Sequence, residues 1–192
     1  MALELEKMHN RAKVERVEDG TYPARICTLV DLGIQEQTDW KTQEPTEPKP
    51  RVLLTFEMPG ELIEIEQDDG TVDQMPRLIS KEYTQSNFER SNLMKLVAAL
   101  KPKLKTLTEL MDEPCLITVG STVNGNAKVT SVVKAPKGMP VPELTKNATY
   151  FDFESPDEEQ FLDLAPWIRI KIKSAVNYNG FADDWGQDEG DA

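Results

Sequence analysis

The pattern of apolar and polar positions predicts a β-rich core that begins at Gly20. Residues 20–30 follow this glycine and are rich in β-branched and aromatic side chains, which favours a strand. Residues 35–50 contain three prolines and few apolar side chains, so we expect an exposed loop in this range. The chain before the glycine has mixed charge and no clear turn signal, and it is interpreted as a loosely attached arm.

The next strand-like runs, 51–58 and 61–66, flank a Pro-Gly turn signal at 59–60 and predict a hairpin. A second turn signal, Asp-Asp-Gly, lies at 68–70. After it, residues 77–84 predict a further strand or a continuation of the third strand.

The period then changes from two to that of a helix. Ser86 or Asn87 can cap a helix through its side-chain oxygen, and leucine and valine recur at three- and four-residue spacing over 93–100. Pro102 ends this pattern. We therefore expect one amphipathic helix that packs on the sheet by one face.

A second hairpin follows this helix. A weak helical turn at 107–111 leads into the buried-strand run 114–120, and Asn-Gly at 124–125 precedes a final strand at 128–134. Residues 164–173 fit either a strand or a helix, and Pro166 in a first-turn position favours the helix.

The predicted order is a strand, a hairpin pair, a helix and a hairpin pair. This order predicts a mostly β fold with helices (α+β), specifically an OB-fold-like five-stranded Greek-key barrel with a helix between strands 3 and 4. An unrelated small barrel and an α+β sandwich have the same element order. The expected divisions are an N-terminal arm (1–19), the barrel (20–135), a proline-rich and acidic linker with a helical segment packing on the barrel (136–179), and a disordered acidic tail (180–192).

The charge is distributed unevenly, and this changes its meaning. The net charge is −12, which argues against a nucleic-acid partner because phosphate binding depends on Lys and Arg. However, residues 152–163 and 183–191 contain eleven acidic side chains and no basic one. The rest of the chain is therefore close to neutral and holds all 22 Lys and Arg residues.

The sequence lacks the usual ingredients of metal and histidine chemistry. The single histidine, His9, lies in the polar N-terminal region, and Cys27 and Cys115 lie far apart within strand-like runs. We expect no metal, no cofactor and no disulfide. The start of the chain has neither a basic region nor an apolar core, and no apolar run approaches the roughly 20 residues of a membrane span, so we expect no membrane partner.

Single-strand binding needs cations along the phosphate backbone and aromatic rings on which bases stack. Strand period places Arg77, Lys81 and Tyr83 on one face of the run 77–84, which is either a binding face or an ordinary solvated one. Trp40 and Lys41 lie in the long first loop, where the tryptophan contacts a ligand or folds back over the barrel. Further cations on or beside predicted strands, each equally suited to a plain surface role, are Arg25, Arg51, Lys128 and Lys134.

Enzymatic chemistry has weaker support. No phosphate-cradling glycine loop, nucleophile elbow or His-Cys pairing is present, so we expect no enzyme. The alternative enzyme is a metal-dependent nuclease that uses strand carboxylates, with Glu57, Glu64, Glu66 and Glu82 as the candidates. A protein-only assembly factor, or an inhibitor that binds no nucleic acid, is a third class.

Four short segments carry a family resemblance that covers about 19–178. They are Asp19-Gly20-Thr21-Tyr22, the helix from Phe88 to Val97, Leu110-Met111-Asp112-Glu113-Pro114, and Leu164-Ala165-Pro166-Trp167-Ile168 continuing to Ser174. With them the chain resembles small phage-encoded OB-type proteins of replication and recombination modules.

The resemblance implies single-stranded DNA binding without strong sequence preference, in DNA replication, recombination or repair in the cytoplasm of an infected bacterial host. It also implies an acidic tail that recruits replication or recombination proteins. Related tails often end in a terminal aromatic or Pro-Phe pair, whereas here Trp185 precedes the last residue, Ala192, by seven positions. The expected partner-binding residues are Phe181, Asp183, Asp184, Trp185, Asp188, Glu189 and Asp191. A homo-oligomer is also compatible with the sequence.

Overall fold

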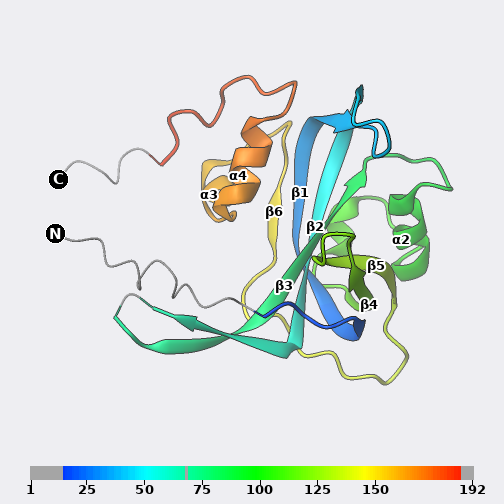
Figure 1. Cartoon of the computed structure of the whole chain (residues 1–192), viewed down its shortest axis with the longest axis vertical. Coiled ribbons are helices and arrows are strands. Elements are labelled where there is room, and N and C mark those ends of the chain that lie inside the picture. The colour runs from blue at the N-terminus through cyan, green and yellow to red at the C-terminus, as the bar shows by residue number, and fades with distance from the viewer. Residues whose placement is uncertain (1–14, 68, 187–192) are drawn as a thin grey trace.

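A six-stranded, mostly antiparallel sheet forms the centre of the protein, and a few short helices flank it (Figure 1). The computed structural model describes residues 15–67 and 69–186. The hydrogen-bonded strand order is β3-β2-β1-β4-β5, and β6 pairs in parallel with β1. The elements are β1 (Gly20–Thr38), β2 (Pro45–Glu66), β3 (Val72–Thr84), α2 (Asn92–Leu100), a 3-10 helix (Leu107–Leu110), β4 (Pro114–Ser121), β5 (Ala127–Lys134), β6 (Thr149–Phe151), α3 (Glu158–Leu162) and α4 (Pro166–Lys173). This confirms the mostly β class with helices.

The first two strands are longer than the sequence predicts. The segment 35–50, expected to be an exposed loop, belongs mainly to β1 and β2, which pair as far as Thr38 with Pro45. Strand β3 flanks β2 only from Arg51 onward. The three prolines of 45–50 therefore lie in the part of β2 that β3 does not flank. Proline is tolerated there, because no neighbouring strand on that side needs its missing backbone N–H.

The hairpin expected at 59–60 is wrong. Strand β2 continues through this point, and a register irregularity separates the pairs Met58 with Arg77 and Leu62 with Pro76. Proline and glycine are both tolerated where a strand bulges, so the same signal that marks a turn here marks a bulge. The chain reverses later, at the turn that contains Gly70, whose φ is +82°.

Helix α2 is confirmed, although its cap differs from the predicted one. Ser91, rather than Ser86 or Asn87, accepts a hydrogen bond from the backbone N–H of Met94 at 3.2 Å. The apolar face of α2 enters a first core together with one face of the sheet. The predicted helix over 164–173 is also confirmed as α4, with Pro166 in its first turn.

The centre of the sheet is buried on both faces, because β2 alternates between two cores. Val52, Leu54 and Phe56 face the first core, and Leu53 faces a second core built with β6, α3 and α4. Figure 1 shows α2 on one side of the sheet and α3 with α4 on the other. The C-terminal segment is thus an integral layer of the fold.

Gly33 allows this second layer to approach closely. A Cβ atom at this position would lie 2.7 Å from Cε2 of Phe153, and its φ of +68° is one that glycine adopts without strain. The backbone N–H of Ile34 donates to the side chain of Asn177 at 2.8 Å. Close packing and this hydrogen bond fasten the C-terminal segment to β1.

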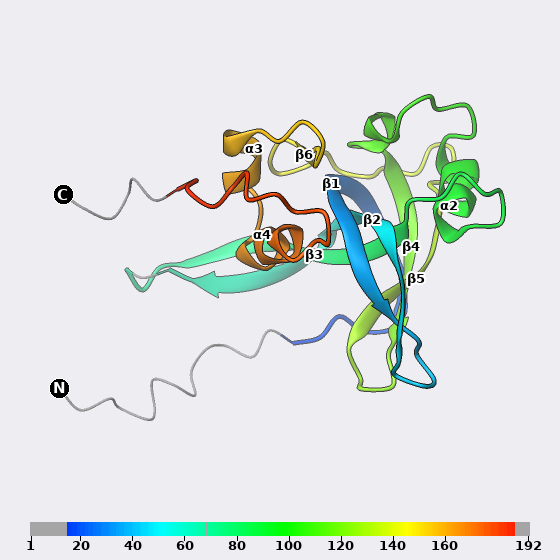
Figure 2. The same ribbon diagram turned by 90° about the horizontal axis from the view of Figure 1, so that it is seen from above.

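The edges of the sheet shape the rest of the molecule. Strands β3 and β5 are in contact, although no backbone ladder joins them among the described residues. The turns of the β1–β2 and β4–β5 hairpins project on the same side of the sheet (Figure 2). The distal part of the β2–β3 hairpin, named the β2–β3 arm (residues 59–76), extends away from both cores (Figures 1 and 2).

No helix in the described part of the chain has the length and apolarity to cross a membrane.

Candidate nucleic-acid interface

A groove of about 680 Å³ lies where β2, β3 and β5 meet the start of α4. We call it the basic groove, because three of its charged side chains are cations. Its lining comprises Arg51, Leu53, Ser80, Lys81, Glu82, Lys128, Val129, Thr130 and Trp167. The structure therefore brings together three cations that the sequence proposed separately, namely Arg51, Lys81 and Lys128.

Lys81 and Lys128 concentrate positive charge in this groove. Partial burial of Lys81 lowers the pKa of its ammonium group, and the nearby charge of Lys128 lowers it further. Within the described residues, neither lysine pairs with a carboxylate. Two like charges held close together without an acidic partner repel each other. An anion bound between them attracts both and offsets this repulsion.

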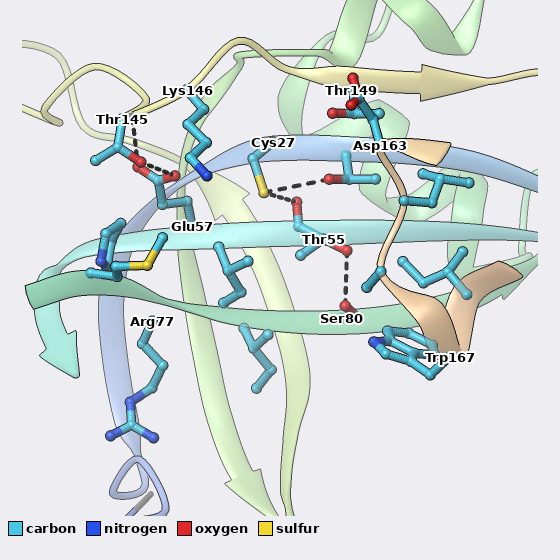
Figure 3. A pocket seen from close by; sticks show the side chains of 18 of the residues that line it. Cys27, Thr55, Glu57, Arg77, Ser80, Thr145, Lys146, Thr149, Asp163 and Trp167 are labelled. Carbon is cyan, nitrogen blue, oxygen red and sulfur yellow. Dashed lines mark hydrogen bonds between the residues drawn. The ribbon is translucent and has the colours of Figure 1, made fainter. Parts of the chain in front are cut away.

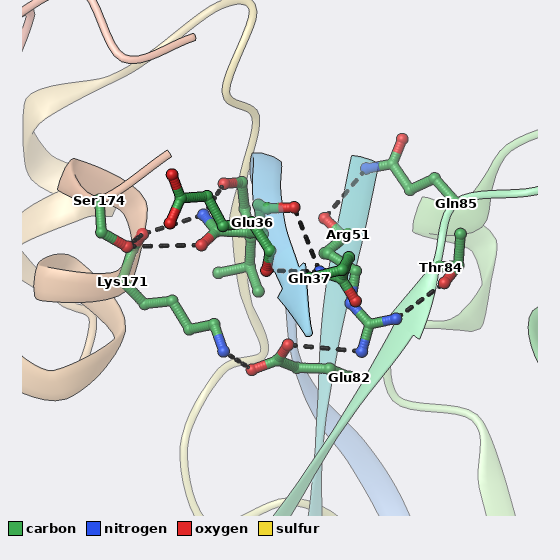
Figure 4. Close-up of polar contacts among 10 residues, drawn as sticks. Glu36, Gln37, Arg51, Glu82, Thr84, Gln85, Lys171 and Ser174 are labelled. Carbon is green, nitrogen blue, oxygen red and sulfur yellow. Dashed lines mark hydrogen bonds and ion pairs between the residues drawn. The ribbon is translucent and has the colours of Figure 1, made fainter. Parts of the chain in front are cut away.

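The third cation of the groove is already partnered. Arg51 donates to Oγ1 of Thr84 at 2.7 Å, and its Nη2 lies 3.5 Å from Oε2 of Glu82 (Figure 4). The other carboxylate oxygen of Glu82 accepts from Lys171 of α4. Glu82 thus neutralises part of the positive charge of the groove and links α4 to β3.

Trp167 supplies the aromatic surface of the groove. It is 49% exposed and follows Pro166 in the first turn of α4. The buried amide of Gln35 fixes the helix, because it donates to the backbone oxygens of Leu32 at 2.7 Å and Lys171 at 3.0 Å. The position of the indole therefore depends on β1 and on the contacts shown in Figure 4.

A second hollow, of about 690 Å³, lies next to the groove, beneath the C-terminal segment. We call it the inner cavity; it lies between β1, β2 and β3 on one side and residues 145–149 and 163–168 on the other (Figure 3). Ser80 and Trp167 line both hollows.

The floor of the inner cavity is polar although it is buried. Thr55 and Glu57 are each 5% exposed, and the hydroxyl of Thr55 lies 2.8 Å from that of Ser80. The two carboxylate oxygens of Glu57 accept from the backbone N–H and the hydroxyl of Thr145, both at 3.0 Å. Burial raises the pKa of the Cys27 thiol beside them to about 11.

Four predicted cations or aromatic residues occupy other places. Arg25 donates to the backbone oxygens of Asp112 and Pro142 at 2.7 and 2.8 Å, so it ties the linker to the sheet. Tyr83 is 3% exposed within the first core, and burial raises the pKa of its phenol. Arg77 donates to the backbone oxygen of Glu15, and the exposed Lys134 ends β5.

Trp40 and Lys41 lie together at the tip of the β1–β2 hairpin. Trp40 is 78% exposed, and Nζ of Lys41 lies 4.9 Å from the centre of its ring. The indole does not fold back over the sheet as a buried lid. An exposed cation–aromatic pair on a hairpin turn is suited to contacts with a ligand.

The aromatic residues of the expected tail belong to the second core. Phe181 packs against Phe153 and Tyr178, with ring centres 5.4 and 4.9 Å apart, and Trp185 packs against Phe161 at 5.4 Å. Residues 180–186 are therefore folded, whereas the sequence predicts disorder from residue 180. Asp183 accepts a hydrogen bond from the hydroxyl of Tyr178 at 2.8 Å, and Asp184 is exposed beside it. Asp188, Glu189 and Asp191 lie outside the described residues.

The carboxylates considered for a nuclease do not converge. Glu57 is bound to Thr145 and Glu82 to two cations, while Glu64 and Glu66 lie on the β2–β3 arm. Within 15–67 and 69–186, no three His, Cys, Asp or Glu side chains are grouped to hold a metal ion.

Sequence reasoning missed Trp167 and the inner cavity. The usable signal was a tryptophan in the first turn of an amphipathic helix, directly after its initial proline. A side chain at that position can lie on the exposed face of the helix. The cavity had no local signal, since its walls come from segments more than a hundred residues apart. No protein-family model, curated protein or solved structure matches this chain.

Proposed function

We propose that this protein binds single-stranded DNA in the basic groove. The observation that carries the proposal is the pair Lys81 and Lys128, which lack a carboxylate partner among the described residues and lie beside the half-exposed indole of Trp167. Phosphates supply the missing anion, and bases stack on the ring. Stacking of this kind contributes about 1–3 kcal/mol per base.

An unpaired strand suits this groove better than a duplex does. Bases within a duplex are already stacked on each other, so their faces are closed to an indole. Phosphate and aromatic faces are common to all nucleotides, so contacts with them give little sequence preference.

The arrangement of the strands supports an OB-type barrel. The order β3-β2-β1-β4-β5, with β5 returning to contact β3, matches the neighbour order of a five-stranded OB barrel, and α2 stands between β3 and β4. In this fold, oligonucleotides bind on the face of strands 2 and 3 and on the loops after strands 1 and 4. The position of the basic groove on β2 and β3, and the hairpin turns after β1 and β4 (Figure 2), support binding in this region.

The resemblance to phage replication and recombination proteins suggests the setting. We propose that the protein coats single strands during phage DNA replication, recombination or repair in an infected bacterium, as a binding protein without catalytic activity. Recruitment of partner proteins through acidic residues near the C-terminus is part of this proposal. Phe181 and Trp185 contribute to it only if they leave the second core, because both rings are packed there.

A fluorescence anisotropy titration tests the proposal. The full-length protein is titrated into a labelled thymidine oligonucleotide of about 20 nucleotides, longer than one OB-type site. We expect binding at low salt that weakens as salt is added. The double variant Lys81→Gln/Lys128→Gln should lose about tenfold or more in affinity, and the slope of log K against log salt should fall by about 0.7 for each lost phosphate contact.

Lys134→Gln is the matched control, because Lys134 lies on the same strand β5 outside the groove. It should leave the affinity and the salt slope nearly unchanged. Failure of the wild-type protein to bind the oligonucleotide at low salt would overturn the proposal. Equal losses in Lys134→Gln and in the double variant would exclude the groove as the binding site.

The β2–β3 arm favours a second candidate function, which is assembly with another protein. Leu62 and Val72 are 53% and 56% exposed on a two-stranded ribbon that lacks a core of its own. Isolated ribbons of this kind are only marginally stable in water. Size-exclusion chromatography with and without oligonucleotide separates this function from DNA binding.

A further inference from the structure

The inner cavity is large, its mostly apolar lining has a polar floor, and the proposed function leaves it without a role. At about 690 Å³ it greatly exceeds the roughly 30 Å³ that one water molecule occupies in the liquid. The second core fills the space around Phe151 and Ile172 so closely that both side chains are fully buried. The same layer leaves a hollow only a short distance along the sheet.

We propose that the inner cavity is a nucleobase-binding site, which receives one or more bases of the strand held in the basic groove. This inference rests on the proposed function and assigns a new site to it. Ser80 and Trp167 line both hollows, so the groove and the cavity lie next to each other at these two residues. A strand whose phosphates lie near Lys81 and Lys128 can turn a base past the indole.

The floor of the cavity carries hydrogen-bonding groups of the kind that base edges require. The hydroxyls of Thr55 and Ser80 have only each other as side-chain partners in the described structure, at 2.8 Å. Each hydroxyl has one donor and two acceptor sites, so the pair leaves capacity for a further ligand. Hydroxyls rotate to donate or accept, and they can therefore bind the edge of any base.

The distribution of charge favours a base over a phosphate in this cavity. Glu57 places a buried carboxylate at the floor, and a phosphate beside it would be repelled. Of the cations in the lining, Lys146 is exposed, Arg16 pairs with Asp19, and Arg77 donates to the backbone of Glu15, although its buried Nε has no partner among the described residues. The uncharged end of a nucleotide thus fits the cavity, and its charged end fits the groove.

The cavity is also held open before any ligand arrives. Glu57 fixes the linker at Thr145 through two hydrogen bonds, and Gln35 fixes the helix that carries Trp167. The walls on both sides are therefore attached to the sheet independently of a ligand. A preformed site binds more tightly, because less ordering is required on binding.

The test uses two labelled oligonucleotides of equal length, one with thymine bases and one with abasic sites in their place. We expect the wild-type protein to bind the thymidine strand at least tenfold more tightly. The variant Thr55→Val/Ser80→Ala removes both hydroxyls with little change in shape. It should lose about five- to tenfold on the thymidine strand, keep its affinity for the abasic strand, and keep its salt slope.

Two further variants complete the comparison. Thr21→Val/Thr118→Val removes another cross-strand hydroxyl pair, 3.2 Å apart and outside both hollows, and it should bind both strands as the wild type does. Ser80→Ala alone is the milder change if the double variant unfolds in urea earlier than the wild type. It should show the same selective loss to a smaller degree.

The outcomes separate this inference from the function on which it rests. Equal wild-type affinity for the two strands would overturn both the base site and the stacking on Trp167, and would leave only phosphate binding in the groove. Equal weakening of Thr55→Val/Ser80→Ala on both strands would overturn it as well, because the hydroxyls would then act on the fold and not on a base. Absence of wild-type binding to either strand would overturn the proposed function itself.

Discussion

Arg51 and Glu82 form an ion pair inside the basic groove, with Nη2 and Oε2 3.5 Å apart. The same carboxylate also binds Lys171 of α4, so a single acid engages one cation that lines the groove and one from the neighbouring helix. The side chains of Arg51 and Glu82 are 19% and 24% exposed, which limits the screening of their interaction by solvent. Glu82 is therefore in a position to compete with a bound phosphate.

Replacement of Glu82 by glutamine should strengthen single-strand binding. The amide keeps the shape of the side chain but removes the charge, so Arg51 and Lys171 become available to phosphates. We expect affinity to rise about three- to tenfold at low salt, with a steeper salt dependence. Glu64→Gln on the β2–β3 arm removes the same charge outside the groove and serves as the control in the anisotropy titration. Weaker binding by Glu82→Gln than by the wild type would contradict this role.

Phe181 should contribute to the stability of the whole protein. Its ring packs against Phe153 and Tyr178, so truncation to alanine leaves a cavity at the edge of the second core. Because the ring is only partly buried, we expect Phe181→Ala to lower the free energy of unfolding by about 1–3 kcal/mol. Urea unfolding followed by circular dichroism measures this loss. Phe88→Ala, at a position 65% exposed, should change stability far less.

Acidic residues at the end of the chain should oppose DNA binding through their charge. A deletion that tests this must start at residue 187, because a cut at 180 would also remove Phe181 and Trp185 from the second core. We expect deletion of 187–192 to tighten oligonucleotide binding at low salt, and the gain should shrink as salt is added. Amide replacements of Asp188, Glu189 and Asp191 keep the length of the chain. They should reproduce the gain, and a gain seen only on deletion would rule out the electrostatic explanation.

Burial of Cys27 should make stability fall at alkaline pH. Burial raises the pKa of this thiol from 9.0 to about 11, so the unfolded chain loses the proton before the folded protein does. The stabilising contribution is complete below pH 9 and disappears as pH rises through about 11. It amounts to about 3 kcal/mol.

The measurement compares urea unfolding of the wild type and of Cys27→Ala at pH 8 and pH 10.5. Other groups titrate in this range, and the comparison cancels their contributions. The wild type should lose more stability than the variant between the two values. Parallel losses would show that Cys27 does not ionise differently in the two states.

Local sequence signals predicted those parts of the fold that depend on near neighbours. The Asn124-Gly125 turn and the helix from Asn92 to Leu100 follow from residues within a few positions of each other. The Pro59-Gly60 signal failed because a turn and a bulge use the same residue types. The pairing of β2 with β3 on both sides of this signal shows that it marks a bulge and not a turn.

The candidate site was predictable as separate residues but not as an arrangement. Lys81 and Lys128 were identified as cations on strands, whereas their proximity depends on how β3 and β5 meet. The strand period placed Tyr83 on the same face as Arg77 and Lys81, yet the first core buries its side chain. Phe181 lies in an acidic, glycine-containing stretch that is typical of disorder, and only the distant Phe153 shows where it packs.

Strand β1 belongs to both cores, with Ala24 and Ile26 in the first and Val30 and Leu32 in the second. Neither core can lose its structure without removing a wall from the other. The C-terminal layer therefore does not melt away from an intact sheet as a separate domain would. Heat or denaturant should unfold the two cores in one cooperative transition, so damage to either one is transmitted to the whole molecule.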